Sequence, residues 1–203
     1  MEEQRVSFGR EALAPFFPRD FSSLRGLGGI PDALLQAHFK LYEGYVKNFN
    51  LLGVALKHAP LGSPEWCEVK RRTGFELNGI RLHELYFENL APGGSALSPG
   101  FADALEATWG SFDHWKDEFK AVAMIRGVGW AILYMDPRTA RLSNHWIGLH
   151  EEGHPAGFVP ILVMDVWEHA FTGMERSEYV DAFFANLHGQ AAEERWKNLR
   201  ASH

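Results

Sequence analysis

The chain has 203 residues, of which 46% are hydrophobic and 23% are charged, and its net charge is −6 with histidine neutral. This composition is that of an ordinary globular protein, long enough for one substantial domain or for two small ones that share a core. A negative net charge with scattered Lys and Arg excludes a typical nucleic-acid binder, which displays a basic face.

The sequence predicts a cytoplasmic protein. Cys67 is the single cysteine, which excludes an internal disulfide framework and fits a reducing compartment. No apolar run is long enough to span a bilayer, and the opening stretch MEEQRVSFGR lacks the apolar segment of a signal peptide. We therefore expect no membrane partner.

The first half of the chain is predicted to be helical. Residues 1–30 are rich in Gly, Pro and aromatic residues and should form an extended arm that ends in the turn GLGGIPD. Asp32 is expected to cap a helix over 32–52, whose apolar residues recur at three- and four-residue steps. A second helix is expected over 65–89, and two long helices joined by a short loop pack as an antiparallel hairpin.

The second half begins at the breaker cluster LAPGGSALSPG, which predicts a domain of residues 1–92 with the arm and hairpin and a domain of residues 93–203. After it we expect helices over 99–108 and 112–125, the latter capped by Ser111, then three strands ending near residue 166 and helix again over 176–200. The predicted fold is therefore α+β, an N-terminal α-helical hairpin followed by an α/β domain with a three-stranded antiparallel sheet.

Two histidines lie within the apolar faces of the predicted hairpin. His38 and Tyr45 are seven residues apart, which is about 700° of helical rotation and within about 20° of two turns, so they share a face. His83 lies on the apolar face of the second helix. Either histidine alone is more often a core residue than a ligand, but helix bundles build metal sites from facing helices.

In the stretch PILVMDVWEHAF, polar residues directly follow a predicted buried strand. A bare Asp165 carboxylate would be costly to bury, so a metal or a hydrogen-bond network must offset that cost. Two interpretations stay open: Asp165 caps the following turn, or Asp165 and His169 bind a metal. Three imidazoles and one carboxylate suit Fe, Mn or Zn better than Ca or Mg. Glu168 is either solvated or orients another histidine.

The loop NHWIGLHEEGH carries His145, His150 and His154 beside two glutamates. Its glycines and its spacing fit no standard zinc pattern, so an independent second metal site is not favoured.

These motifs together resemble the iron/manganese superoxide dismutase family. DVWEHAF resembles the family signature D-x-W-E-H-A-[YF], and four further stretches match in order: HFKLYEGYVKNFN, LHELYFENLAP, GSFDHWKDEFKAVA and GVGWAIL. The matches cover most of residues 30–200. The resemblance implies the two-part fold predicted above and a superoxide dismutase that forms dioxygen and hydrogen peroxide by ping-pong one-electron cycling of one Fe or Mn ion per subunit.

Carried over motif by motif, the resemblance also implies roles for individual residues. The implied metal ligands are His38, His83, Asp165 and His169. The implied aromatic walls of the metal pocket are Trp130 and Trp167. Tyr45 matches the tyrosine at the mouth of the substrate channel. Glu168 matches a glutamate that reaches across the subunit interface to the partner's metal-binding histidine, which implies a homodimer or homotetramer. His150 aligns best with the group that hydrogen-bonds the metal-bound solvent, because Gly79 occupies the other position from which members supply it.

The chain departs from the family pattern at several places, among them a second helix that is one residue short between Phe75 and His83 and a shortened segment after the signature. His38 precedes Tyr45 by seven residues where members have eight, and we hypothesise a regular helix without a π-bulge. Leu41 and Thr172 stand where members have a channel histidine and its tyrosine partner. We therefore expect an intact ligand set beside an altered interface. The alternatives are a non-catalytic metal-binding relative and a different metal enzyme, such as a dioxygenase.

Overall fold

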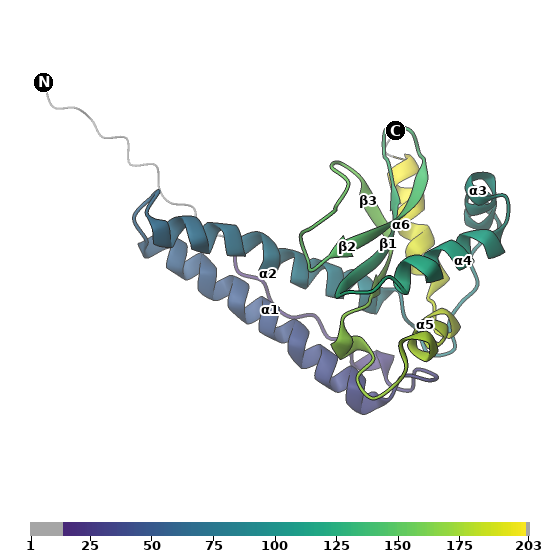
Figure 1. Ribbon diagram of the computed structural model, residues 1–203, viewed down its shortest axis with the longest axis horizontal. Helices are drawn as coiled ribbons and strands as arrows, with labels where there is room; N and C mark the ends of the chain where they lie inside the picture. Colours follow the sequence, from purple (N-terminus) through teal and green to yellow (C-terminus); the bar gives the residue numbers. More distant parts are fainter. Residues whose placement is uncertain (1–13, 202–203) are drawn as a thin grey trace, which may run out of the picture.

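The computed structural model describes residues 14–201, which form an α+β fold (Figure 1). A hairpin of α1 (Asp32–His58) and α2 (Pro64–Glu88) extends to one side, and the sheet with the remaining helices lies at the other. Residues 14–30 of the predicted arm are non-helical apart from the short 3-10 helix η1 (Ser22–Leu24). Residues 1–13 of that arm lie outside the described residues. The predicted fold class is confirmed.

Helix α1 differs from its prediction at both ends. It continues past residue 52 to His58 and stops at Ala59, which adopts an extended conformation because a proline follows it. The predicted cap was wrong. Pro31 is the N-cap residue, and the Asp32 carboxylate instead accepts a hydrogen bond of 2.9 Å from Gly26 N, which fixes the preceding turn.

Helix α2 starts close to its predicted position. The Ser63 hydroxyl accepts a hydrogen bond of 3.1 Å from Trp66 N, and Pro64 occupies the first turn, where its missing N–H costs nothing. The two helices run side by side as the predicted antiparallel pair (Figure 1). Their shared core includes Tyr42 and Val46 from α1 and Ile80 from α2. No helix in the described part of the chain is long and apolar enough to cross a membrane.

Two helices and a sheet follow the hairpin. Helix α3 (Pro99–Trp109) precedes α4 (Phe112–Ala123), and the predicted Ser111 cap is confirmed by a 3.1 Å bond from His114 N. The strands β1 (Gly129–Met135), β2 (Leu142–Gly148) and β3 (Val159–Asp165) form an antiparallel sheet in the order β2-β1-β3. Trp130 on the fully buried β1 pairs with Asp165 on β3, so both stand at one end of the sheet.

The C-terminal segment is two helices, not the continuous helix predicted over 176–200. Helices α5 (Arg176–Ala185) and α6 (Gly189–Ala201) are separated by a stretch that bonds to the chain after α2. Ala91 N donates to Asn186 O at 2.9 Å, and His188 N donates to Asn89 O at 2.7 Å. These long-range bonds use backbone groups that a continuous helix would need for itself.

Candidate metal centre

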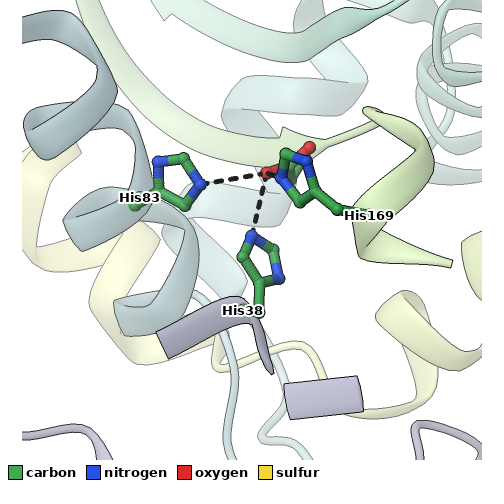
Figure 2. A group of neighbouring side chains, drawn as sticks. His38, His83 and His169 are labelled. Atoms are coloured by element: carbon green, nitrogen blue, oxygen red, sulfur yellow. Dashed lines mark hydrogen bonds and ion pairs between the residues drawn. The ribbon is translucent and has the colours of Figure 1, made fainter. Parts of the chain in front are cut away.

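Four side chains from four elements meet between the hairpin and the sheet. They are His38 of α1, His83 of α2, Asp165 at the end of β3 and His169 of the 3-10 helix η2 (Glu168–Ala170). One donor atom from each lies within 4.8 Å of the others. Figure 2 shows the three imidazole rings turning toward one another. The structure thus brings together the four residues that the sequence singled out as ligands.

The Asp165 carboxylate lies at the centre of this group. Its Oδ2 is 3.0 Å from His38 Nε2, 3.1 Å from His169 Nε2 and 3.5 Å from His83 Nε2. Its Oδ1 accepts a 2.8 Å hydrogen bond from Trp167 N. The capping interpretation therefore accounts for one oxygen, while the other faces the imidazoles. Burial favours the neutral acid, but His169 and His38 hold the pKa of Asp165 below its ordinary value, so the carboxyl stays ionised.

Two of the histidines, His38 and His83, are held in the neutral form. His83 Nδ1 lies 2.6 Å from Gly79 O, so Nδ1 carries the proton and the Nε2 lone pair is free. That Nε2 atom is buried and has no hydrogen-bond partner among the described residues. Burial lowers the pKa of His38 and, more strongly, that of His83, which keeps both rings neutral as metal binding requires. Three imidazoles and one buried carboxylate fit a transition-metal ion.

Tyr45 stands beside this group on the same helix as His38. Helix α1 is α-helical throughout, which confirms the predicted absence of a π-bulge. The Tyr45 ring centroid lies 5.1 Å from that of His83, and its hydroxyl is 2.8 Å from Nε2 of His150. The seven-residue spacing therefore does bring the tyrosine to the ligand side of the helix.

His150 follows β2 and is fully buried. Its Nδ1 accepts a 3.0 Å hydrogen bond from Trp130 Nε1, and its carbonyl accepts a 2.8 Å bond from Asn78 Nδ2. The preceding Leu149 has a φ of 51°, a left-handed conformation that is unusual for a non-glycine residue and turns the chain sharply at this point. Sequence spacing gave no signal for Asn78, since its bond to His150 joins segments far apart in the chain.

Trp130 and Trp167 flank the histidine cluster. The Trp130 ring meets the His83 ring edge-on at 5.0 Å. Trp167 stacks on His150 at 4.9 Å and on His169 at 5.8 Å. Aromatic surface thus covers two sides of the histidine cluster, which limits the space for a bulky substrate.

The other loop histidines lie apart from the cluster. His145 Nε2 is 2.9 Å from the Ser143 hydroxyl. His154 lies between the Tyr134 hydroxyl, at 2.6 Å, and the carbonyl of His150, at 2.9 Å. Within residues 14–201 one group of side chains is arranged so that it could hold a metal ion, and these two histidines do not belong to it.

The two departures from the family pattern, Leu41 and Thr172, lie together at the surface. They line a mainly apolar pocket of about 440 Å³ that reaches His38 and His169. Glu168, next to His169 in the chain, is exposed. Its backbone carbonyl accepts a 3.0 Å bond from the Thr172 hydroxyl.

Gly79 offers a test of the Tyr45 position. A Cβ atom at Gly79 would lie 2.6 Å from Cδ1 of Tyr45, so Gly79→Ala should displace the ring and break its bond to His150. We expect retained metal and a loss of about 1–3 kcal/mol in unfolding free energy. The superoxide consumption that the family resemblance implies should fall about 10-fold to 100-fold. Gly74 of the same helix is the control, because a Cβ there meets nothing within 4 Å. Equal activities of the two alanine variants would contradict the prediction.

The burial of His150 should make stability depend on pH. Burial lowers its pKa to about 4 from an ordinary value of 6.5, so between these values the unfolded chain binds a proton that the folded chain does not. This contribution to stability is present above pH 6.5 and is lost as the pH falls toward 4. With chelator present, the unfolding free energy of the unmodified protein should fall between about pH 7 and pH 5. In His150→Gln this fall should be smaller by about 2 kcal/mol. Urea unfolding followed by circular dichroism measures this difference, and equal losses would contradict it.

Comparison with known proteins agrees with the family resemblance found in the sequence. Residues 98–195 match the family described as iron/manganese superoxide dismutases, C-terminal domain. The chain is 34% identical over 179 residues to the superoxide dismutase (Fe) of Cupriavidus metallidurans, which covers 84% of this chain and 90% of the relative. It is 33% identical over 193 residues to the superoxide dismutase (Fe) of Aquifex aeolicus, covering 89% and 90%. A superoxide dismutase (Mn) of Haloarcula marismortui is 40% identical over 126 residues, covering 60% and 62%.

Proposed function

This chain belongs to the iron/manganese superoxide dismutase family, and from that premise we propose that it converts superoxide to dioxygen and hydrogen peroxide. One Fe or Mn ion per subunit would be held by His38, His83, Asp165 and His169. The observation that carries this proposal is the convergence of their donor atoms within 4.8 Å around a buried carboxylate.

The bound ion supplies the one-electron oxidation and reduction that no side chain here performs readily. The Asp165 carboxylate would offset part of the ion's positive charge, while imidazoles, which bind a metal in their neutral form, would add none. Tyr45 holds a hydroxyl beside the cluster, where it would move protons and control entry. Trp130 and Trp167 exclude water from the sides that they cover.

Metal analysis combined with a superoxide-consumption assay on the purified protein tests this function. We expect Fe or Mn in the protein as isolated and rapid superoxide consumption that scales with the metal content. Full Fe or Mn content without consumption would overturn the proposal and favour the alternative, a non-catalytic or differently active relative.

We also propose that the protein assembles as a homodimer or homotetramer through the face around Glu168. This is supported by the exposed carboxylate beside His169 and by the neighbouring apolar pocket at Leu41 and Thr172, which a second copy would cover. Glu168→Ala should weaken the assembly in sedimentation experiments. Glu106→Ala, which removes an exposed glutamate of α3, should leave it unchanged. A monomeric unmodified protein at micromolar concentration would contradict the proposal.

A cytoplasmic location is a further proposal. The exposed free thiol of Cys67 supports it, because such a thiol persists best in a reducing compartment. Cell fractionation with marker proteins tests it.

We retain as a proposal the division into domains of residues 1–92 and 93–203. The order of the elements supports it, because both long helices precede the boundary and all three strands follow it. The two parts nevertheless share one hydrophobic core, and the segment at the boundary is hydrogen-bonded to the stretch between α5 and α6. Limited proteolysis tests the division, and a first cleavage elsewhere within residues 14–201 would contradict it.

A further inference from the structure

Both ring nitrogens of His150 are engaged by other side chains. Trp130 Nε1 lies 3.0 Å from Nδ1, and the Tyr45 hydroxyl oxygen lies 2.8 Å from Nε2. An indole N–H can only donate a hydrogen bond, so Nδ1 must accept it and can carry no proton. The Trp130 contact therefore determines which nitrogen of the neutral ring is protonated.

The ring cannot turn over without losing these bonds. Phe75 meets it at 4.5 Å and Trp167 stacks on it at 4.9 Å. A half-turn about the Cβ–Cγ axis would place carbon atoms where Nδ1 and Nε2 now stand, leaving Trp130 and Tyr45 without partners. Asn78 and His154 also bond to the backbone carbonyl of His150, which holds the residue in place from the other side.

A neutral imidazole has a single N–H group. Since the Trp130 contact leaves Nδ1 without a proton, the His150 ring is neutral. Because Nδ1 is an acceptor, that N–H is on Nε2 and is directed at the Tyr45 oxygen. We propose that Trp130 fixes His150 as the Nε2–H tautomer. Tyr45 then accepts the hydrogen bond from Nε2. It keeps its own hydroxyl hydrogen, which it can donate to a small anion or solvent molecule beside the histidine cluster.

The direction of the hydrogen bond between His150 and Tyr45 changes the role of His150. The family resemblance implies that His150 itself bonds the metal-bound solvent, but its only N–H is used by Tyr45. Burial raises the pKa of Tyr45, so its hydroxyl remains protonated, and its ring lies 5.1 Å from that of His83. Tyr45 is therefore the donor at the centre, while His150 and Trp130 are positioning residues that act through it. The hydrogen-bond direction stands on the geometry alone, and its use in catalysis rests on the proposed function.

Nitrogen-15 NMR of histidine-labelled, zinc-loaded protein tests the tautomer. Zinc is redox-inert and has a filled d shell, so it leaves the resonances of nearby nuclei sharp. We expect His150 to show a directly bonded proton on Nε2 and an unprotonated Nδ1. A proton on Nδ1 in the unmodified protein would overturn the proposal.

The two tryptophans provide a matched pair of variants. Trp130→Phe and Trp167→Phe remove the same atoms next to His150, but Trp167 Nε1 has no hydrogen-bond partner among the described residues. In Trp130→Phe the resonances of Nδ1 and Nε2 should shift toward each other as the ring samples both tautomers. In Trp167→Phe they should remain those of the Nε2–H form. No shift in Trp130→Phe, or an equal shift in both variants, would overturn the role given to Trp130.

Neutron diffraction from crystals of the unmodified protein with its native metal needs no variant and keeps the proposal testable if Trp130→Phe does not fold. Deuterium should be visible on Nε2 of His150 and absent from Nδ1, with the Tyr45 deuterium pointing away from His150. Deuterium placed between Tyr45 and an unprotonated Nε2 would contradict the proposal. Both methods detect proton positions and not turnover, so their outcome is independent of whether the protein consumes superoxide.

Discussion

A His169→Ala variant is expected to fold but to contain almost no iron or manganese and to consume no superoxide. The substitution removes one of four donors, the Nε2 atom 3.1 Å from Asp165 Oδ2. The His169 side chain is 26% exposed, whereas those of His38 and His83 are 2% and 0% exposed, so its truncation leaves the smallest cavity of the three. Loss of a neighbour that merely orients a ligand costs about 10-fold to 100-fold in metal affinity or activity, and loss of a ligand should cost more.

Metal content by mass spectrometry, superoxide consumption and circular dichroism together measure this result. His114→Ala is the matched control, because His114 is exposed on α4 and its ring Nδ1 lies at the long distance of 3.4 Å from Trp109 O. That variant should keep both metal and activity. Full metal content in His169→Ala would refute its assignment as a ligand.

Exchange of the native ion for zinc should abolish superoxide consumption and leave the fold intact. Zinc accepts the same imidazole and carboxylate donors but has no accessible redox change. Chelator treatment should first lower the unfolding temperature. An ion whose free concentration is 100 times its dissociation constant stabilises the folded state by about 2.7 kcal/mol, and removing the ion removes this stabilisation. Zinc should restore that temperature without restoring activity, while iron or manganese should restore both.

The His169→Ala variant supplies the control for this exchange. Added zinc should leave its unfolding temperature close to that of the metal-free protein. Superoxide consumption by a zinc form free of iron and manganese would contradict the assignment of the chemistry to a redox metal.

Local sequence patterns predicted the features of this protein that depend on neighbours along the chain. The seven-residue spacing placed His38 and Tyr45 on one helical face, and the end of a buried strand marked Asp165. The Ser111 cap was predicted because it acts within one turn. The family resemblance then identified which histidines meet, a question that spacing alone had left open.

The features that the sequence did not predict depend on contacts between distant segments. The break between α5 and α6 arises from backbone bonds to the chain after α2, and the Asp32 carboxylate binds a preceding turn instead of capping its own helix. Nothing near Gly79 in the chain indicates that the ring of Tyr45 lies against it, although a buried glycine within a helix is a signal of close approach. His150 was selected by alignment, but its partners Trp130 and Asn78 became evident only in three dimensions.

The centre at Asp165 also has a consequence for how the chain reaches its fold. His38 and Asp165 are 127 residues apart in the sequence, so their meeting closes a loop that spans most of the protein. The entropy cost of closing a loop rises only slowly with its length, and an ion held by both ends opposes reopening as a cross-link would. The bound ion is therefore expected to act as a cross-link between α1 and the end of β3.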